Sequence, residues 1–178
     1  MSWPRQIVFE SAFDSRAIAT IAELASAIQP STNDQTLQGR EFRYAKARWL
    51  ERSSSTEFIF GLLTEMMEIA NRDFRFDIQG FGEPLLHVTY PVGGHFSWHT
   101  DTSYGTMATR KLSVSVLLSE APTFEGGRLE FCPGGALENG SSAGSAIVFP
   151  SYMAHRVSPV TRGERVALVA WMHGSEFR

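Results

Sequence analysis

The chain is short of cysteine, of long apolar runs and of secretory signals, and each shortage excludes a class of protein. Cys132 is the single cysteine among 178 residues, so an intramolecular disulfide and a cysteine-based zinc or iron–sulfur site are excluded. No apolar run reaches the length of a membrane span. The start MSWPRQIVFE lacks the charged and apolar regions of a signal peptide. These features predict a protein of the reducing cytoplasm, with no membrane partner.

The chain also lacks an excess of positive charge. Its 16 Lys and Arg residues against 19 Asp and Glu residues give a formal net charge of −3. This balance argues against a nucleic-acid partner, because no broad basic field is available for a phosphate backbone. The length fits one domain with a sizeable core.

Two helices are predicted in the first third of the chain. Asp14 is placed as an N-cap, and apolar residues repeat at helical spacing from Ile18 until Pro30 ends the pattern. Residues 54–57 form a capping-box sequence before a second apolar stripe, which ends near Asn71. We expect both helices to pack on one face of a sheet.

Residues 41–50, between these helices, read EFRYAKARWL and partly alternate between apolar and basic positions. Arg43, Lys46 and Arg48 form the basic set. Two interpretations stay open: a solvated strand face, or a basic wall near a site that meets a carboxylate-bearing substrate.

From Phe74 onward the apolar pattern alternates, starting with Phe74, Phe76 and Ile78. Strand-like runs separated by Gly- and Pro-containing turns follow at 85–90, 95–99, 112–118, 128–131, 145–149, 155–160 and 165–172. Such short strands after two helices predict a double-sheet jelly roll or barrel. We therefore expect one domain over residues 1–178, mainly β with flanking α, with a helical N-terminal part (1–73) and a jelly-roll core (74–173).

The candidate metal ligands begin with His99 and Asp101. Residues i and i+2 of a strand point to the same face, so the imidazole and the carboxylate can converge on one ion. They would supply two legs of a 2-His-1-carboxylate triad, and His155, on a later strand, would supply the third. Arg165 opens the next run, where a hairpin would place its guanidinium fork beside the strand of His155.

These four residues predict a site for Fe(II) with three open positions. A 2-oxo acid would occupy two of them and dioxygen the third. Arg165 would hold the far carboxylate, which favours 2-oxoglutarate. A zinc hydrolase could use the same triad but would not need Arg165. A non-catalytic module that senses iron or 2-oxoglutarate is a further alternative.

Several stretches resemble the Fe(II)/2-oxoglutarate dioxygenases, in particular their prolyl-4-hydroxylase-like (PKHD-type) branch. The resemblance covers residues 80–172 and rests on Tyr90-Pro91, His99-x-Asp101, RKLSVSVLLSE, EGGRLEF and GSAIVFPSYMAHRVSPVTRGERVALVAW.

The resemblance implies a double-stranded β-helix with the triad at its open mouth, and conversion of 2-oxoglutarate to succinate and CO2. It implies hydroxylation of a prolyl or other amino-acid residue, in a peptide, in a protein or as a free amino acid. Arg165 would anchor the C5 carboxylate, Tyr90 would help to hold the co-substrate, and Trp171 would pack beside Arg165. Retention of Asp101, which related halogenases replace, favours hydroxylation. AlkB-like nucleic-acid demethylation stays open as an alternative.

Strand parity extends these expectations to neighbouring residues. His95 shares the parity of His99 and is expected to line the pocket, whereas Trp98 is expected to pack between the sheets. His87 is interpreted as structural or as a supporting residue, and His173 as exposed. Loops 31–40 and 102–109 are expected to select the substrate.

Overall fold

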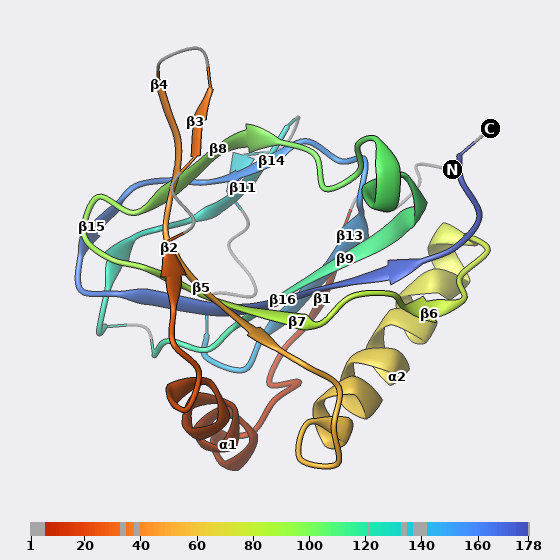
Figure 1. Ribbon diagram of the computed structural model, residues 1–178, viewed down its shortest axis with the longest axis horizontal. Coiled ribbons are helices and arrows are strands. Elements are labelled where there is room, and N and C mark those ends of the chain that lie inside the picture. The colour runs from red at the N-terminus through yellow and green to blue at the C-terminus, as the bar shows by residue number, and fades with distance from the viewer. Residues whose placement is uncertain are drawn as a thin grey trace.

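Two β-sheets face each other, and both helices lie against the outer face of one of them (Figure 1). This computed structural model describes residues 6–32, 35–37, 40–120, 122–132, 135–136 and 142–177. Within that part, the major sheet has eight strands, in the order β1 (Ile7–Phe9), β13 (Ala146–Pro150), β9 (Arg110–Leu117), β16 (Arg165–His173), β7 (Leu85–Tyr90), β5 (Lys46–Leu50) and β2 (Ser31–Thr32), with β6 (Gly80–Phe81) beside β16.

The minor sheet has six strands within the described residues. Their order is β12 (Gly135–Ala136), β11 (Leu129–Phe131), β14 (His155–Val157), β8 (His95–His99), β4 (Arg40–Tyr44) and β3 (Gln35–Leu37). A short pair, β10 (Glu125–Gly126) with β15 (Val160–Arg162), closes one end. The predicted architecture, mainly β with two helices on one sheet, is confirmed.

Helix α1 (Ser15–Ser26) begins where the sequence predicts. The side chain of Asp14 accepts a 2.7 Å hydrogen bond from the backbone N–H of Ala17 and so caps the helix. Helix α2 (Glu57–Phe74) begins at Thr56 without the predicted capping box, because the Thr56 hydroxyl donates to the Glu51 carbonyl instead. The Glu57 carboxylate pairs with Arg52.

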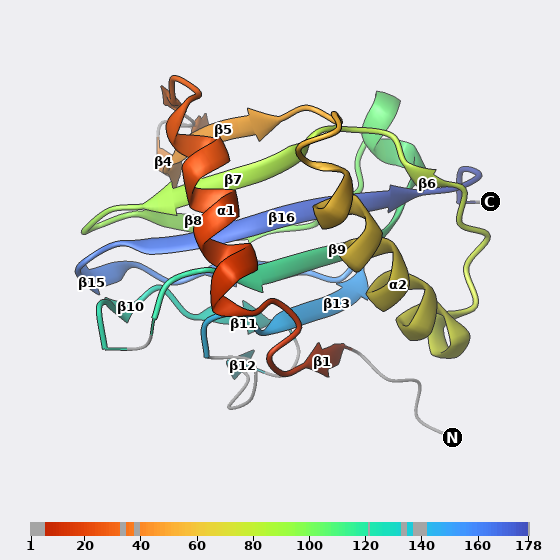
Figure 2. The same ribbon diagram turned by 90° about the horizontal axis from the view of Figure 1, so that it is seen from below.

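Figure 2 shows both helices lying across the major sheet. Their apolar stripes bury residues such as Ile21 and Leu63 against Leu112 and Leu168 in one core cluster. Along β16 the even positions, Leu168 among them, face this core, and the odd positions face the minor sheet. The alternation therefore fixes which side chains of β16 reach the space between the sheets.

Two sequence expectations for the N-terminal part are wrong. Residues Phe74–Ile78 do not form a strand, because α2 continues to Phe74 and the chain then turns at Arg75, which has a left-handed φ of 58°. The part expected to be helical also supplies strands β1 to β5, two of which extend the minor sheet. In the described residues, no helix is both long and apolar enough to cross a membrane.

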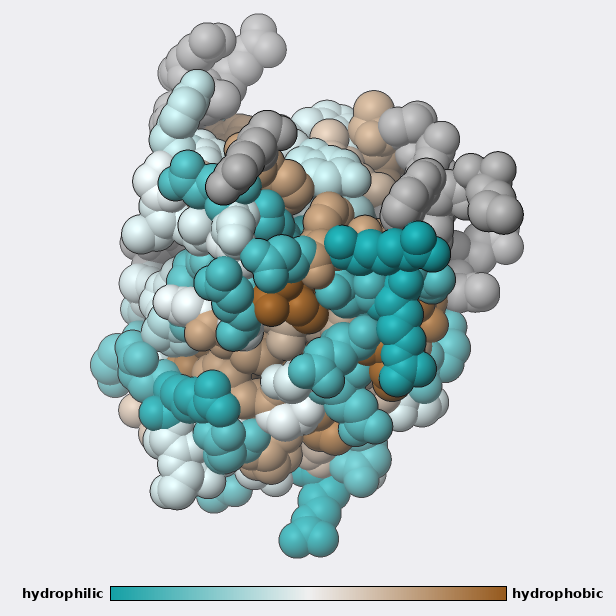
Figure 3. All heavy atoms as spheres, turned by 90° about the vertical axis from the view of Figure 1, so that its right-hand side faces the viewer, coloured by the Kyte–Doolittle hydropathy of each residue, from teal (hydrophilic) through white to brown (hydrophobic). Residues whose placement is uncertain are grey.

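Figure 3 shows the end of the molecule that carries η1 (Gly105–Thr109), α2, β6 and the C-terminal segment. Hydrophobic surface gathers near its middle, between hydrophilic groups. Phe76, Tyr152 and Phe177 meet edge to face in the described part of the chain, with ring centroids 5.8 to 6.2 Å apart.

Candidate metal centre

Strand pairing brings two histidines side by side. His99 ends β8 and His155 begins β14, and the two are direct partners in this antiparallel pair. The Nδ1 atom of His99 lies 2.7 Å from the carbonyl oxygen of Ser97, and that of His155 lies 2.9 Å from the carbonyl oxygen of Met153. A carbonyl can only accept, so each Nδ1 carries the proton and each Nε2 keeps a free lone pair.

Asp101 completes the set. Its Oδ1 lies 3.6 Å from Nε2 of His99, and its Oδ2 lies 3.6 Å from Nε2 of His155. The ligand atoms of the three residues all lie within 4.8 Å of one another, and they form the one such group in the part of the chain that the structure describes. Two imidazole nitrogens and one carboxylate fit Fe(II) with open positions. The predicted triad is thus present.

The carboxylate of Asp101 is held by the major sheet, although its ligand partners lie on the minor sheet. Ser113 on β9 donates a 2.6 Å hydrogen bond to Oδ2, and the backbone N–H of Asp101 donates to the Ser151 carbonyl at 2.8 Å. Arg110 donates to the backbone carbonyl of Asp101 at 3.1 Å. Contacts of this kind orient metal ligands before the metal arrives.

The electrostatics of the site favour the forms that bind a cation. Burial would raise the pKa of the Asp101 carboxyl, but His155, His99 and the Ser113 hydroxyl outweigh burial and hold this pKa well below its usual range. Burial lowers the pKa of His155, against the attraction of Asp101. Near neutral pH the site therefore presents a carboxylate and, at His155, a neutral imidazole.

Arg165 and Tyr90 form the opposite wall of the same pocket. They are register partners on β16 and β7, and the guanidinium carbon of Arg165 lies 5.6 Å from the Tyr90 ring centroid. Burial raises the pKa of the Tyr90 phenol, against the charges of Arg43 and Arg165. Arg165 is only 5% exposed, and it forms no salt bridge within the described part of the chain.

The hairpin expected to carry Arg165 to the His155 strand does not form. Strand β15 intervenes and pairs with β10, so β14 and β16 lie in different sheets. Arg165 reaches the pocket from across the gap instead. Trp171 lines the same pocket but lies further along β16, so it does not pack beside Arg165 as expected; the guanidinium carbon of Arg110 lies 3.8 Å from its ring centroid.

A shift in strand register overturns the expectations for His95 and Trp98. The β14–β8 pairing joins His155 to His99 but Val157 to Phe96, so Phe96 and His99 both line the pocket. His95 instead lies at the surface, with Nδ1 3.0 Å from the Gly93 carbonyl. Trp98 is 42% exposed rather than packed between the sheets.

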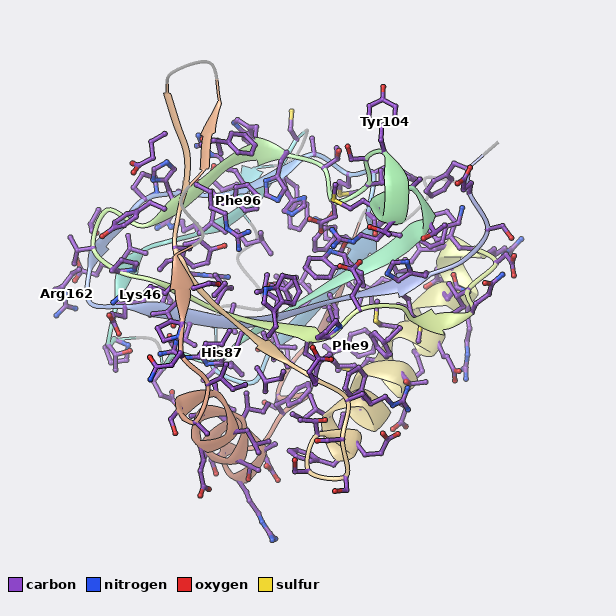
Figure 4. The ribbon with its side chains drawn as sticks, in the orientation of Figure 1. Phe9, Lys46, His87, Phe96, Tyr104 and Arg162 are labelled. Atoms are coloured by element: carbon purple, nitrogen blue, oxygen red, sulfur yellow. The ribbon has the colours of Figure 1, made fainter. Side chains whose placement is uncertain are left out.

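His87 and His173 lie away from the triad. Figure 4 shows His87 on the α1 side of the major sheet, and Phe96 on the other sheet. Burial and the charge of Arg48 lower the pKa of His87 to about 4. His173 is not exposed as expected: its Nε2 lies 3.0 Å from a carboxylate oxygen of Glu83, which also binds Arg110.

The basic residues of 41–50 point in different directions, so neither interpretation holds for all of them. Arg43 is 7% exposed and lines the pocket. Lys46 is exposed. The Nε of Arg48 donates to the Ile28 carbonyl at 3.0 Å, after the end of α1. The sequence signal that could have separated Arg43 from the others was the parity break at Ala45, where β4 ends and β5 has yet to begin. Loop 31–40 lies partly outside the described residues.

Comparisons with known proteins agree with this site. The family model of the 2OG-Fe(II) oxygenase superfamily matches residues 85–173. A PKHD-type hydroxylase of Sphingopyxis alaskensis is 34% identical over 110 residues, which cover 58% of this chain and 50% of that relative. A PKHD-type hydroxylase of a Shewanella species is 38% identical over 95 residues, which cover 50% of this chain and 42% of that relative. The chain thus spans about half the length of the curated relatives it matches.

Solved structures show the same fold. A Pseudomonas putida prolyl-4-hydroxylase superposes with a TM-score of 0.72 at 20% identity, over 96% of this chain and 92% of that one. A Trichoplax adhaerens prolyl hydroxylase, in complex with a peptide fragment of the hypoxia inducible factor oxygen degradation domain, superposes with a TM-score of 0.76 at 15% identity, over 95% and 83%. The predicted double-stranded β-helix is confirmed.

Proposed function

Because this chain belongs to the 2OG-Fe(II) oxygenase superfamily, whose model matches half of it, we propose that it hydroxylates an unactivated C–H bond of an amino-acid substrate. The observation that carries the proposal is one pocket in which His99, Asp101 and His155 face Arg165. When bound, Fe(II) supplies the activation of dioxygen: one oxygen atom enters the substrate, the other enters succinate, and 2-oxoglutarate loses CO2.

The residues of the chain divide the work between the two sheets. His99, Asp101 and His155 would hold the metal through two nitrogens and one oxygen. Arg165 would bind the C5 carboxylate of 2-oxoglutarate through its fork of N–H donors. Tyr90, buried against Arg165, would orient the co-substrate. Trp171 would close the pocket wall and exclude water.

The buried Arg165 separates this function from a zinc hydrolase. Burying a guanidinium without a partner is costly, and a hydrolase with the same triad would need no such group. A sensor module is disfavoured because all three ligands are present and pre-oriented. One G-x-S-x-G match occurs at residues 140–144. It leads into strand β13, whereas a nucleophile elbow opens a helix.

The substrate class rests on the relatives. The matched curated proteins are PKHD-type hydroxylases, and two structural neighbours are prolyl hydroxylases, one of them with a bound peptide fragment. We extend to this chain the class that these proteins share: an amino-acid residue, in a peptide, in a protein or as a free acid. The net charge of −3 continues to disfavour nucleic acid.

An anaerobic titration tests the function. The protein is loaded with Fe(II), 2-oxoglutarate is added, and the visible charge-transfer band of the chelated 2-oxo acid is followed. We expect a band in the wild type and none in Asp101→Ala. Admitting oxygen should then release succinate. Tight metal binding without a band would favour the zinc or sensor alternative, and absence of metal binding would refute the proposal.

A further inference from the structure

Arg43 is a buried cation whose partner is missing from the described part of the chain. Its side chain is 7% exposed and lines the pocket of the triad. No described residue forms a salt bridge with it, and its Nε has no hydrogen-bond partner. An unpaired buried charge is expensive. A pocket that keeps one is expected to receive an anion.

The position of Arg43 ties it to the reacting centre. Its guanidinium carbon lies 4.5 Å from the centroid of the Phe96 ring, and that ring stacks on His99 with centroids 3.5 Å apart. Register pairing between β4 and β8 places Arg43 directly beside Phe96. The guanidinium is therefore one aromatic ring away from a metal ligand, on the wall formed by the minor sheet.

The charge of the pocket exceeds what the co-substrate can neutralise. Its charged lining residues are two arginines, Arg43 and Arg165, and one carboxylate, Asp101. Adding a divalent cation and the two carboxylates of 2-oxoglutarate leaves one positive charge unmatched. Arg165 comes from the major sheet and Arg43 from the minor sheet. The two guanidiniums thus occupy opposite walls, as two separate anchors would.

We propose that Arg43 binds a carboxylate of the primary substrate. The substrate is then an amino acid or similar small acid whose free carboxylate lies a few bonds from the hydroxylated carbon, rather than an internal residue of a protein. This inference rests on the proposed function. The bidentate fork of Arg43 would fix the substrate in register, and Phe96 would set the spacing between that carboxylate and His99.

The test compares acids with their amides on the complete protein. Wild type is loaded anaerobically with Fe(II) and 2-oxoglutarate, and a panel of free L-amino acids and the matching carboxamides is titrated calorimetrically. The same panel is then scored in air for increased succinate release. We expect the ligands that bind to be acids, each roughly 10- to 100-fold tighter than its amide, the range for one charge-assisted hydrogen bond.

Variants assign that preference to Arg43. In Arg43→Met the acid should lose its advantage over the amide, and in Arg43→Lys, which keeps the charge without the fork, it should keep part of it. The 2-oxoglutarate charge-transfer titration should change by less than twofold in both variants. Arg48→Met is the matched control, because Arg48 lies on the adjacent strand with its Nε on the Ile28 carbonyl. It should behave as wild type.

Three results would overturn the inference while leaving the proposed function in place. One is equal binding of acids and amides, or no binding by any acid of the panel, in a protein that shows the charge-transfer band. Another is an acid preference that survives in Arg43→Met. The third is a large loss of 2-oxoglutarate affinity in Arg43→Met, which would make Arg43 a co-substrate contact. Failure of the proposed function is distinct, since the band itself would then be absent.

Discussion

The hydrogen bond from Ser113 to Asp101 offers a sharp test of how this site is built. Ser113 is fully buried on β9, and its hydroxyl lies 2.6 Å from Oδ2 of Asp101 and 3.0 Å from the hydroxyl of Ser151. Ser113→Ala removes one oxygen atom and no ligand. We expect weaker metal binding in a folded protein, because the carboxylate loses the group that fixes its orientation.

The magnitude follows from the contact. A hydrogen bond to a charged group contributes about 1.5–3 kcal/mol, which corresponds to roughly 10- to 100-fold in affinity. Loss of a supporting contact of this kind typically costs 10–100-fold in metal affinity. We therefore expect the Fe(II) dissociation constant to rise by roughly 10- to 100-fold. The hydrogen bond also lowers the pKa of Asp101, so the variant should begin to lose its metal at a higher pH than wild type does.

Ser115 provides the control. It lies two residues further along β9, lines the same pocket and makes no side-chain hydrogen bond within the described part of the chain. Anaerobic calorimetric titration of Fe(II) into wild type, Ser113→Ala and Ser115→Ala should set the first variant apart from the other two. Iron affinity in Ser113→Ala within twofold of wild type, or an equal loss in Ser115→Ala, would refute the reasoning.

Two further predictions concern the far wall of the pocket and the helix-covered face of the major sheet. Arg165→Met should raise the 2-oxoglutarate concentration needed for half-maximal charge transfer by roughly 10- to 100-fold, since it removes a charge-assisted bidentate contact; Fe(II) affinity should stay within a few-fold, and an unchanged 2-oxoglutarate requirement would place the anchor elsewhere. The folded-state pKa of His87, about 4, lies below the unfolded value of about 6.5, so the unfolded state binds the extra proton and stability falls as pH drops from about 6.5 towards 4. Between pH 7 and pH 5 this costs about 2 kcal/mol, and His87→Leu should flatten the urea-unfolding profile by that amount; an unchanged slope would contradict it.

Local pattern predicted the parts of the fold that depend on neighbouring residues. Strands β7 and β8 begin and end at the predicted residues, and Asp14 caps α1 as expected. The triad spacing was readable because His99 and Asp101 are close in sequence. Their contact with His155 could be proposed only as a convergence, since the pairing of β8 with β14 joins residues far apart in the chain.

The rest of the site depends on contacts that periodicity does not encode. The register shift between β8 and β14 moves Phe96 into the pocket and His95 out of it, so strict alternation assigns both residues to the wrong face. The part of Arg43 in the pocket requires β4 to join the minor sheet while β5 joins the major one. That division occurs at Ala45, within one apparently continuous strand pattern. The pairing of Glu83 with Arg110 and His173 likewise joins three separate stretches.

The origin of the ligands explains why Ser113 matters more than its size suggests. Both histidines belong to the minor sheet, whereas Asp101 is held by Ser113, Ser151 and Arg110 from the major sheet or the turn that follows it. An ion bound to all three ligands would therefore connect the two sheets across their gap. Any loosening of the hold on Asp101 acts on the distance between the sheets, and through it on the separation of the Arg43 wall from the Arg165 wall. A contact that touches neither ion nor substrate can thus set the geometry of both.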